Sequence, residues 1–119
     1  MRRLILIGLL LLAGCHPDPA RRQRHARIAE AKTLIAEHCA ACHRVPGVPG
    51  TNGRVGPSLA DIGTQMIIAG HFANTPDNLA RWIADPQELL PGDAMPDTGV
   101  TYEQARSIAF YLYSQGQPE

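Results

Sequence analysis

The stretch Cys39-Ala40-Ala41-Cys42-His43 decides how this chain folds. Two cysteines separated by two residues and followed at once by a histidine have the spacing of a c-type haem attachment site. One helical turn can present all three side chains together, so that the two thiols reach the two vinyl groups on one edge of the macrocycle. The adjacent imidazole then reaches the iron. We therefore expect one haem c, attached through Cys39 and Cys42, with His43 as an iron ligand.

Two other kinds of site share part of this spacing. A redox-active disulfide pair uses two cysteines at the same separation, but it has no need of His43. A zinc site would require a second pair of ligands, which the sequence does not supply. The only other cysteine is Cys15, so no thiol is left over if Cys15 has a separate role.

The N-terminus has the pattern of an export signal. Two arginines follow the first methionine, and residues 4–12 are apolar, a run too short to span a bilayer comfortably. The run Leu12-Ala13-Gly14-Cys15 resembles a bacterial lipobox, which predicts a signal peptide over residues 1–14 and acylation of Cys15. An ordinary secretory peptide or an uncleaved anchor are the alternatives. Each of these exports the domain, and export agrees with a haem that is joined to such proteins outside the cytoplasm.

Residues 15–25 read as an extended linker ahead of a single domain over residues 26–119. Two prolines and several polar residues follow Cys15, which is typical of a tether. The arginines of this region would lie near anionic lipid headgroups; they are Arg21, Arg22, Arg24 and Arg27. A plain, solvated helix start is the alternative.

Length and composition limit the core. The chain has 119 residues, a formal net charge of zero and only 5% aromatic residues. One domain of this size buries a modest core, so a covalently bound apolar cofactor would supply what the side chains do not. The neutral charge gives no indication of nucleic-acid binding.

Three stretches have helical patterns. Apolar residues spaced three or four apart between Ile28 and His38 predict a helix that ends at the attachment cysteines. Thr75 and Pro76 have the pattern of an N-cap and first helical residue, and the helix should stop at Asp85-Pro86. A third helix should begin after Thr101, with Gln104 completing a capping box, and end near residue 116.

These features together resemble a class I cytochrome c over residues 26–115. The resemblance implies an all-α fold of three to five short helices wrapped around one covalently bound haem c. Gly56-Pro57-Ser58-Leu59 is similar to the family's Gly-Pro-x-Leu loop, in which the proline carbonyl accepts a hydrogen bond from the proximal imidazole, here His43. In the family the first and last helices cross, and the positions that match the crossing are Ala31, Ile35, Ile108 and Tyr111.

The second iron ligand should come from the C-terminal half. Ala94-Met95-Pro96 resembles the family's methionine loop, and a thioether ligand favours ferrous iron and raises the potential. Met95 is therefore the predicted ligand. The rivals are Met66, which reads as core, His71, which would make a bis-histidine iron, and an open sixth position.

A further resemblance covers residues 70–86, which look like the cytochrome c domain attached to subunit II of some haem-copper oxidases. Trp82 occupies the place where some family members direct an aromatic side chain toward the haem, so it can contact a haem propionate or pack in the core. The resemblance implies respiratory redox partners, among them a haem-copper oxidase. The export signal and Cys15 at the N-terminus predict that the domain lies, lipid-anchored, at the periplasmic face of the cytoplasmic membrane.

An iron held by two protein ligands has no coordination position for a substrate, so we expect an electron carrier rather than an enzyme. Apolar loop residues would form its docking surface; they are Val45, Pro46, Val48 and Met66. A haem enzyme or a gas sensor are the alternatives, and both would need an open or displaceable sixth ligand.

Overall fold

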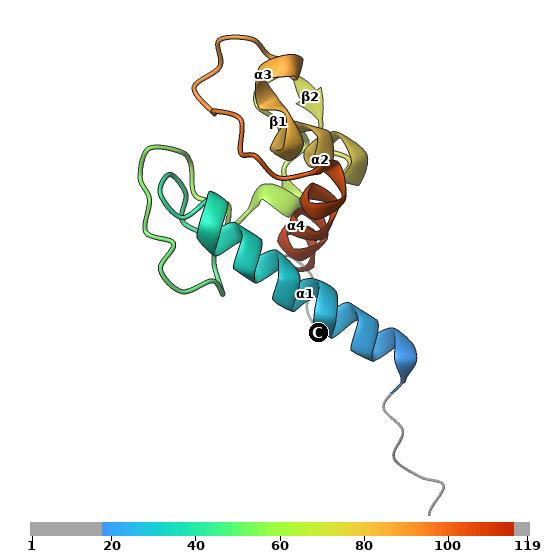
Figure 1. Ribbon diagram of the computed structural model, residues 1–119. Coiled ribbons are helices and arrows are strands. Elements are labelled where there is room, and N and C mark those ends of the chain that lie inside the picture. The colour runs from blue at the N-terminus through green and yellow to red at the C-terminus, as the bar shows by residue number, and fades with distance from the viewer. Residues whose placement is uncertain (1–17, 116–119) are drawn as a thin grey trace, which may run out of the picture.

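The computed structural model of the protein describes residues 18–115. Its elements, in chain order, are α1 (Pro19–His38), the 3₁₀ helix η1 (Ile62–Thr64), β1 (Ile67–Ile68), β2 (Phe72–Ala73), α2 (Pro76–Ala84), α3 (Pro86–Leu89) and α4 (Tyr102–Ser114). The fold is mostly helical, as predicted (Figure 1). None of the helices in this part of the chain is both long and apolar enough to cross a membrane.

Helix α1 begins earlier than the sequence indicated. Asp18 caps it by accepting a hydrogen bond from the amide of Ala20 at 3.1 Å, and Pro19 occupies the first turn. The extended linker expected up to residue 25 is therefore helical from residue 19, because alanine, arginine and glutamine are strong helix formers. The predicted signal peptide and Cys15 lie outside the described residues.

Helices α1 and α4 pack against each other, which is the crossing that the resemblance implied. Ala31 and Ile35 of α1 are buried with Ile108 and Tyr111 of α4. The small side chain of Ala31 lets the two backbones approach closely. By contrast, residues 18–26 are exposed, and Figure 1 shows this end of α1 projecting past α4.

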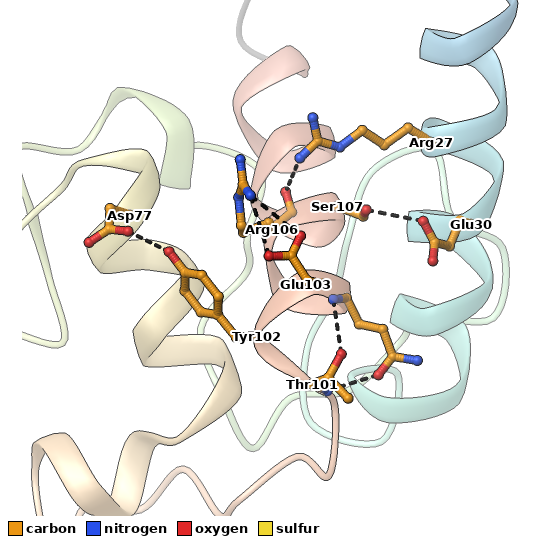
Figure 2. Close-up of polar contacts among 9 residues, drawn as sticks. Arg27, Glu30, Asp77, Thr101, Tyr102, Glu103, Arg106 and Ser107 are labelled. Carbon is orange, nitrogen blue, oxygen red and sulfur yellow. Dashed lines mark hydrogen bonds and ion pairs between the residues drawn. The ribbon is translucent and has the colours of Figure 1, made fainter.

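Polar side-chain contacts also join α1 and α4 (Figure 2). The Arg27 guanidinium donates to the carbonyl of Arg106 at 3.2 Å and lies 4.7 Å from the centre of the Phe110 ring. Ser107 donates to the carboxylate of Glu30 at 3.1 Å. Together with the apolar contacts, these bonds make α1 and α4 one structural unit.

Helix α2 begins and ends where the sequence predicted. The Thr75 side chain accepts from the amide of Asn78 at 3.1 Å, Pro76 is the first helical residue, and Asp85 ends the helix. Its buried face packs on α4, and the Tyr102 hydroxyl donates to Asp77 across this contact (Figure 2). The predicted capping box of α4 is also confirmed, with Thr101 and Gln104 bonding each other's backbone amides.

A short antiparallel hairpin was not predicted from the sequence. Ile67 pairs with Ala73 and Ile68 with Phe72, and the connecting turn takes positive φ at Ala69 and Gly70. Asn74 holds the hairpin in place, because its side-chain amide donates to the carbonyls of Ile62 and Gln65 at 2.6 and 2.7 Å.

Candidate cofactor site

The attachment motif forms a tight turn at the end of α1. The Cys39 amide donates to Ile35 at 2.9 Å, and the amides of Cys42 and His43 both donate to the Cys39 carbonyl, at 3.1 and 2.9 Å. This turn directs three side chains into one pocket, which Cys39, Cys42 and His43 all line. Both thiols are free, so the motif is not closed into a disulfide.

The two thiols differ in exposure. Cys39 is buried and Cys42 is half-buried. Burial, together with the nearby Cys42, raises the pKa of the Cys39 thiol to about 11. Cys39 therefore keeps its proton at neutral pH.

The imidazole of His43 is held in one orientation by the loop that follows. Its Nδ1 lies 2.7 Å from the carbonyl oxygen of Pro57, which confirms the predicted contact. A carbonyl can only accept, so Nδ1 carries the hydrogen and Nε2 keeps a free lone pair. Gly56 makes this approach possible, because a Cβ at this position would overlap the imidazole ring.

Met95 lies on the part of the pocket wall that the C-terminal half provides. It is half-buried, and the pocket is lined there by Asp93, Ala94, Met95 and Pro96. The two rival ligands lie elsewhere: Met66 is 88% exposed, His71 is exposed, and neither lines this pocket. The expectation that Met66 belongs to the core is therefore wrong, since it lies at the surface before the hairpin.

The pocket has a volume of about 330 Å³. Apart from the motif and the methionine loop, its walls are mainly aliphatic, and the buried aliphatic side chains that line it are Ile68, Leu79, Ile83, Ile108 and Leu112. Two thiols, an oriented imidazole and a thioether in an apolar pocket suit a flat, apolar macrocycle with a central iron. The residues present therefore fit a haem.

Trp82 also lines the pocket, from helix α2. Its side chain is 8% exposed, and its ring centre lies 6.0 Å from that of Phe72. This position agrees with an aromatic wall beside the cofactor. A hydrogen bond from its indole to a propionate stays a prediction.

Comparison with known proteins decides the family. Residues 28–116 match the family model of cytochrome c. The chain belongs to the cytochrome c family. Its fold is therefore that of a class I cytochrome c, as predicted, and a domain of this family carries covalently bound haem c, for which Cys39 and Cys42 are in place.

The curated relatives are larger proteins that contain a similar region. The chain is 36% identical over 77 residues to cytochrome c oxidase subunit 2 of Alkalihalophilus pseudofirmus, covering 64% of this chain and 22% of that protein. It is 33% identical over 89 residues to cytochrome c oxidase subunit 2 of Bacillus sp. strain PS3, covering 71% and 25%. The chain thus spans about a quarter of the length of these relatives.

The apolar residues that the sequence suggested as a docking surface are not all exposed. Val45 and Val48 are buried, because Thr51 folds their loop inward with hydrogen bonds to both residues. The exposed apolar side chains are instead Val55, Met66 and Ile67, at 85%, 88% and 55%. Of the docking residues expected from the sequence, Pro46 and Met66 are at the surface.

Proposed function

We propose that this protein carries single electrons between respiratory-chain partners at the outer face of a bacterial cytoplasmic membrane, and that it is not an enzyme. The observation that carries the proposal is the pocket with Cys39, Cys42 and His43 on one part of its wall and Met95 on another. Haem bound there supplies a one-electron iron couple. With His43 and Met95 as its two protein ligands, no position is left for a substrate.

The chain's own residues prepare the site for electron transfer without rearrangement. Pro57 fixes the imidazole of His43 before any change of charge occurs, and the aliphatic side chains of the pocket would contact the bound haem in place of water. A rigid, dry environment keeps reorganisation small when an electron enters or leaves. The neutral thioether of Met95 favours the ferrous state and so raises the potential.

The first experiment is an absorption spectrum of the haem-loaded protein in both oxidation states. We expect the weak far-red band that depends on a bond between methionine sulfur and ferric iron. Met95→Ala should remove this band, whereas Met66→Ala should retain it because Met66 lies at the surface. If the unaltered protein lacks the band and its reduced form binds carbon monoxide readily, the sixth position is open and an enzyme or a sensor becomes the better explanation.

A haem-copper oxidase is the proposed redox partner. The support is the similarity to the two subunits named cytochrome c oxidase subunit 2. Reduced protein added to bacterial membranes that contain such an oxidase should be oxidised with cyanide-sensitive oxygen uptake. Membranes from which the oxidase has been deleted provide the control, and equal rates in both preparations would exclude this partner.

A lipid on Cys15 is the proposed anchor, after removal of residues 1–14. The support comes from the sequence around Cys15 and from the arginines that follow closely. Arg21, Arg22 and Arg24 are exposed on the projecting end of α1, and no acidic residue occurs between Pro19 and Ala29. Basic side chains near an anionic membrane surface each add about 1 kcal/mol of attraction.

Two measurements test the anchor. Mass spectrometry of the protein purified from membranes should show a diacylglycerol-modified Cys15 at its N-terminus, and Cys15→Ala should abolish the modification. Replacing the three exposed arginines by glutamine should weaken binding to phosphatidylglycerol vesicles but not to phosphatidylcholine vesicles. Arg44→Gln with Arg54→Gln, which removes exposed arginines from another region, is the control.

A further inference from the structure

Gln87 bonds the backbone of the loop that carries Met95. Its side-chain Nε2 donates to the carbonyl of Asp93 at 2.9 Å and to the carbonyl of Met95 itself at 2.8 Å. Its Oε1 accepts from the amide of Gly92 at 3.0 Å. One carboxamide thus satisfies two acceptors and one donor of the loop, including the carbonyl of the predicted iron ligand.

The position of Gln87 is also fixed by the helix to which it belongs. It is the second residue of α3, directly after Pro86, which is among the most deeply buried side chains. Asp85 caps this helix through the amide of Glu88 at 3.0 Å. The backbone amide of Gln87 also donates to Asp97 at 3.3 Å, so both its main chain and its side chain bond the same loop.

Within the part of the chain that the structure describes, the other hydrogen bonds of the loop do not join the Met95 main chain to a helix. The Met95 amide donates to Asp93 at 2.9 Å, but Asp93 belongs to the loop itself. Thr98 donates to the carbonyl of Ile83 at 2.8 Å, three residues beyond Met95. Among residues 18–115, the hydrogen bond from the Gln87 side chain to the Met95 carbonyl therefore joins the Met95 main chain to a helix.

We propose that Gln87 is a positioning residue that holds Met95 at the pocket. The proposal rests on the proposed role of Met95 as the iron ligand. If Met95 binds the iron, movement of its loop away from α3 would displace the thioether, and the bonds that the Gln87 carboxamide makes would oppose that movement. Gln87 therefore sets how readily Met95 can be displaced, without touching the cofactor.

Competition with imidazole measures this displacement. Added imidazole binds ferric iron only when the methionine leaves, so its apparent affinity reports the cost of opening the loop. Gln87→Leu removes all three bonds that oppose opening, and their loss should raise the affinity for imidazole at least about tenfold. The weak far-red band should fade at correspondingly lower imidazole concentrations.

Gln104→Leu is the matched control. It makes the same chemical change in another helix and also removes a side-chain bond to a backbone amide, that of Thr101 at 2.8 Å. Gln104 does not line the pocket. A merely structural role for Gln87 would make both variants less stable and leave imidazole affinity the same in both, and that result would overturn the proposal.

Gln87→Glu tests the donating nitrogen of the carboxamide separately from its accepting oxygen. The variant has the same shape and keeps an oxygen for the Gly92 amide, but it replaces the donor facing Asp93 and Met95 by a carboxylate oxygen. We expect an increase in imidazole affinity at least as large as in Gln87→Leu. An affinity like that of the unaltered protein would show that the donated bonds do not hold Met95, and would also overturn the proposal.

Amide exchange in the unaltered, haem-loaded protein provides a test that needs no variant to fold. The Gly92 amide should be protected, because it donates to Gln87, and exchange at the rate of an open loop would refute the contact. The role of Met95 is tested separately by Met95→Ala. If the far-red band is missing from the unaltered protein but the Gly92 amide is protected, the ligand assignment has failed and the contact between Gln87 and the loop has not.

Discussion

At the scale of single residues, Gly56 controls where the imidazole of His43 can lie. An ideal Cβ on Gly56 would overlap the ring, with Nδ1 at 2.7 Å and Nε2 at 3.0 Å. Gly56→Ala should therefore displace the ring and break its bond to Pro57, lowering the free energy of unfolding by about 1–3 kcal/mol. The absorption spectrum should show weakened histidine ligation.

Gly50→Ala is the control for this prediction. Gly50 has a positive φ of 81° but no atom within 4 Å of an added Cβ. The substitution should cost about 1–2 kcal/mol through backbone strain and leave the spectrum unchanged. If both variants keep the native spectrum, Gly56 does not control the position of His43.

The three tyrosines should ionise late as the pH rises. A hydrogen bond to Asp77 raises the pKa of Tyr102, and burial raises the pKa of Tyr111 and Tyr113. Tyrosine ordinarily has a pKa of about 10, so in the folded protein clearly less than half of the tyrosine should be ionised at pH 10. The absorbance of tyrosinate, compared between native and denatured protein, measures this fraction.

The same pKa shifts make the free energy of unfolding depend on pH in the alkaline range. Because the folded pKa values exceed the unfolded ones, the unfolded chain loses its tyrosine protons first. The free energy of unfolding should receive the full tyrosine contribution below about pH 10 and lose it as the pH rises through the folded pKa values. Tyr102→Phe should make this alkaline loss smaller, and an unchanged profile would contradict the Asp77 contact.

At the scale of helices, two N-caps of similar chemistry should have different effects. Thr101 caps α4, whose buried face contacts α1 and α2. Asp18 caps α1 where residues 18–26 are exposed. Thr101→Ala should lower the free energy of unfolding by about 1 kcal/mol, because α4 cannot fray without disturbing the core.

Asp18→Ala is the companion variant. It should leave the global unfolding transition within error and increase amide exchange only in the first turns of α1, since those turns fray without exposing core. Chemical denaturation and hydrogen exchange measure the two effects. A large global loss in Asp18→Ala would mean that the projecting end of α1 does contribute to the core.

Helix signals in the sequence were reliable where capping is local. The observed helix starts are those marked by Thr75 with Pro76 and by Thr101 with Gln104. A capping hydrogen bond joins residues only three positions apart, so a short stretch of sequence is enough to predict it. The start of α1 was misplaced, because prolines on either side of Asp18 suggested an extended tether. The hairpin was missed as well, since a pair of two-residue strands is too short to show an alternating pattern.

As with the helix starts, the sequence predicted those parts of the site that depend on short motifs. The attachment motif and the bond between His43 and Pro57 follow from short motifs, and the structure brings them together with Met95 and Trp82 around one pocket. The bonds of Gln87 could not be predicted in this way. Its partners are backbone carbonyls, which every residue carries, so only the folded path of the loop identifies them.

At the scale of the whole molecule, the domain should depend on its cofactor for stability. The pocket that would hold haem has a volume of about 330 Å³ and is lined by several buried core residues. Without haem, the aliphatic side chains that line this pocket lose the surface they would pack against and face water, which removes hydrophobic stabilisation that a small domain can hardly replace.

A double variant with Cys39→Ala and Cys42→Ala cannot attach haem. It should therefore lack a cooperative unfolding transition, while it retains part of its helical circular dichroism. Haem-loaded protein measured in parallel is the reference. A sharp thermal transition in the haem-free variant, at a similar temperature, would show that the side chains alone can hold the fold.

The length of helix α1 separates its projecting end from the attachment motif. Its 20 residues make a rigid rod about 30 Å long, with Pro19 at one end and the attachment motif directly after the other. The first turn of α1 is thus separated from the attachment cysteines by about the length of this helix. The exposed first turns of α1 and the pocket are therefore two separate regions of the domain, and a contact made at one of them would leave the other accessible to a partner.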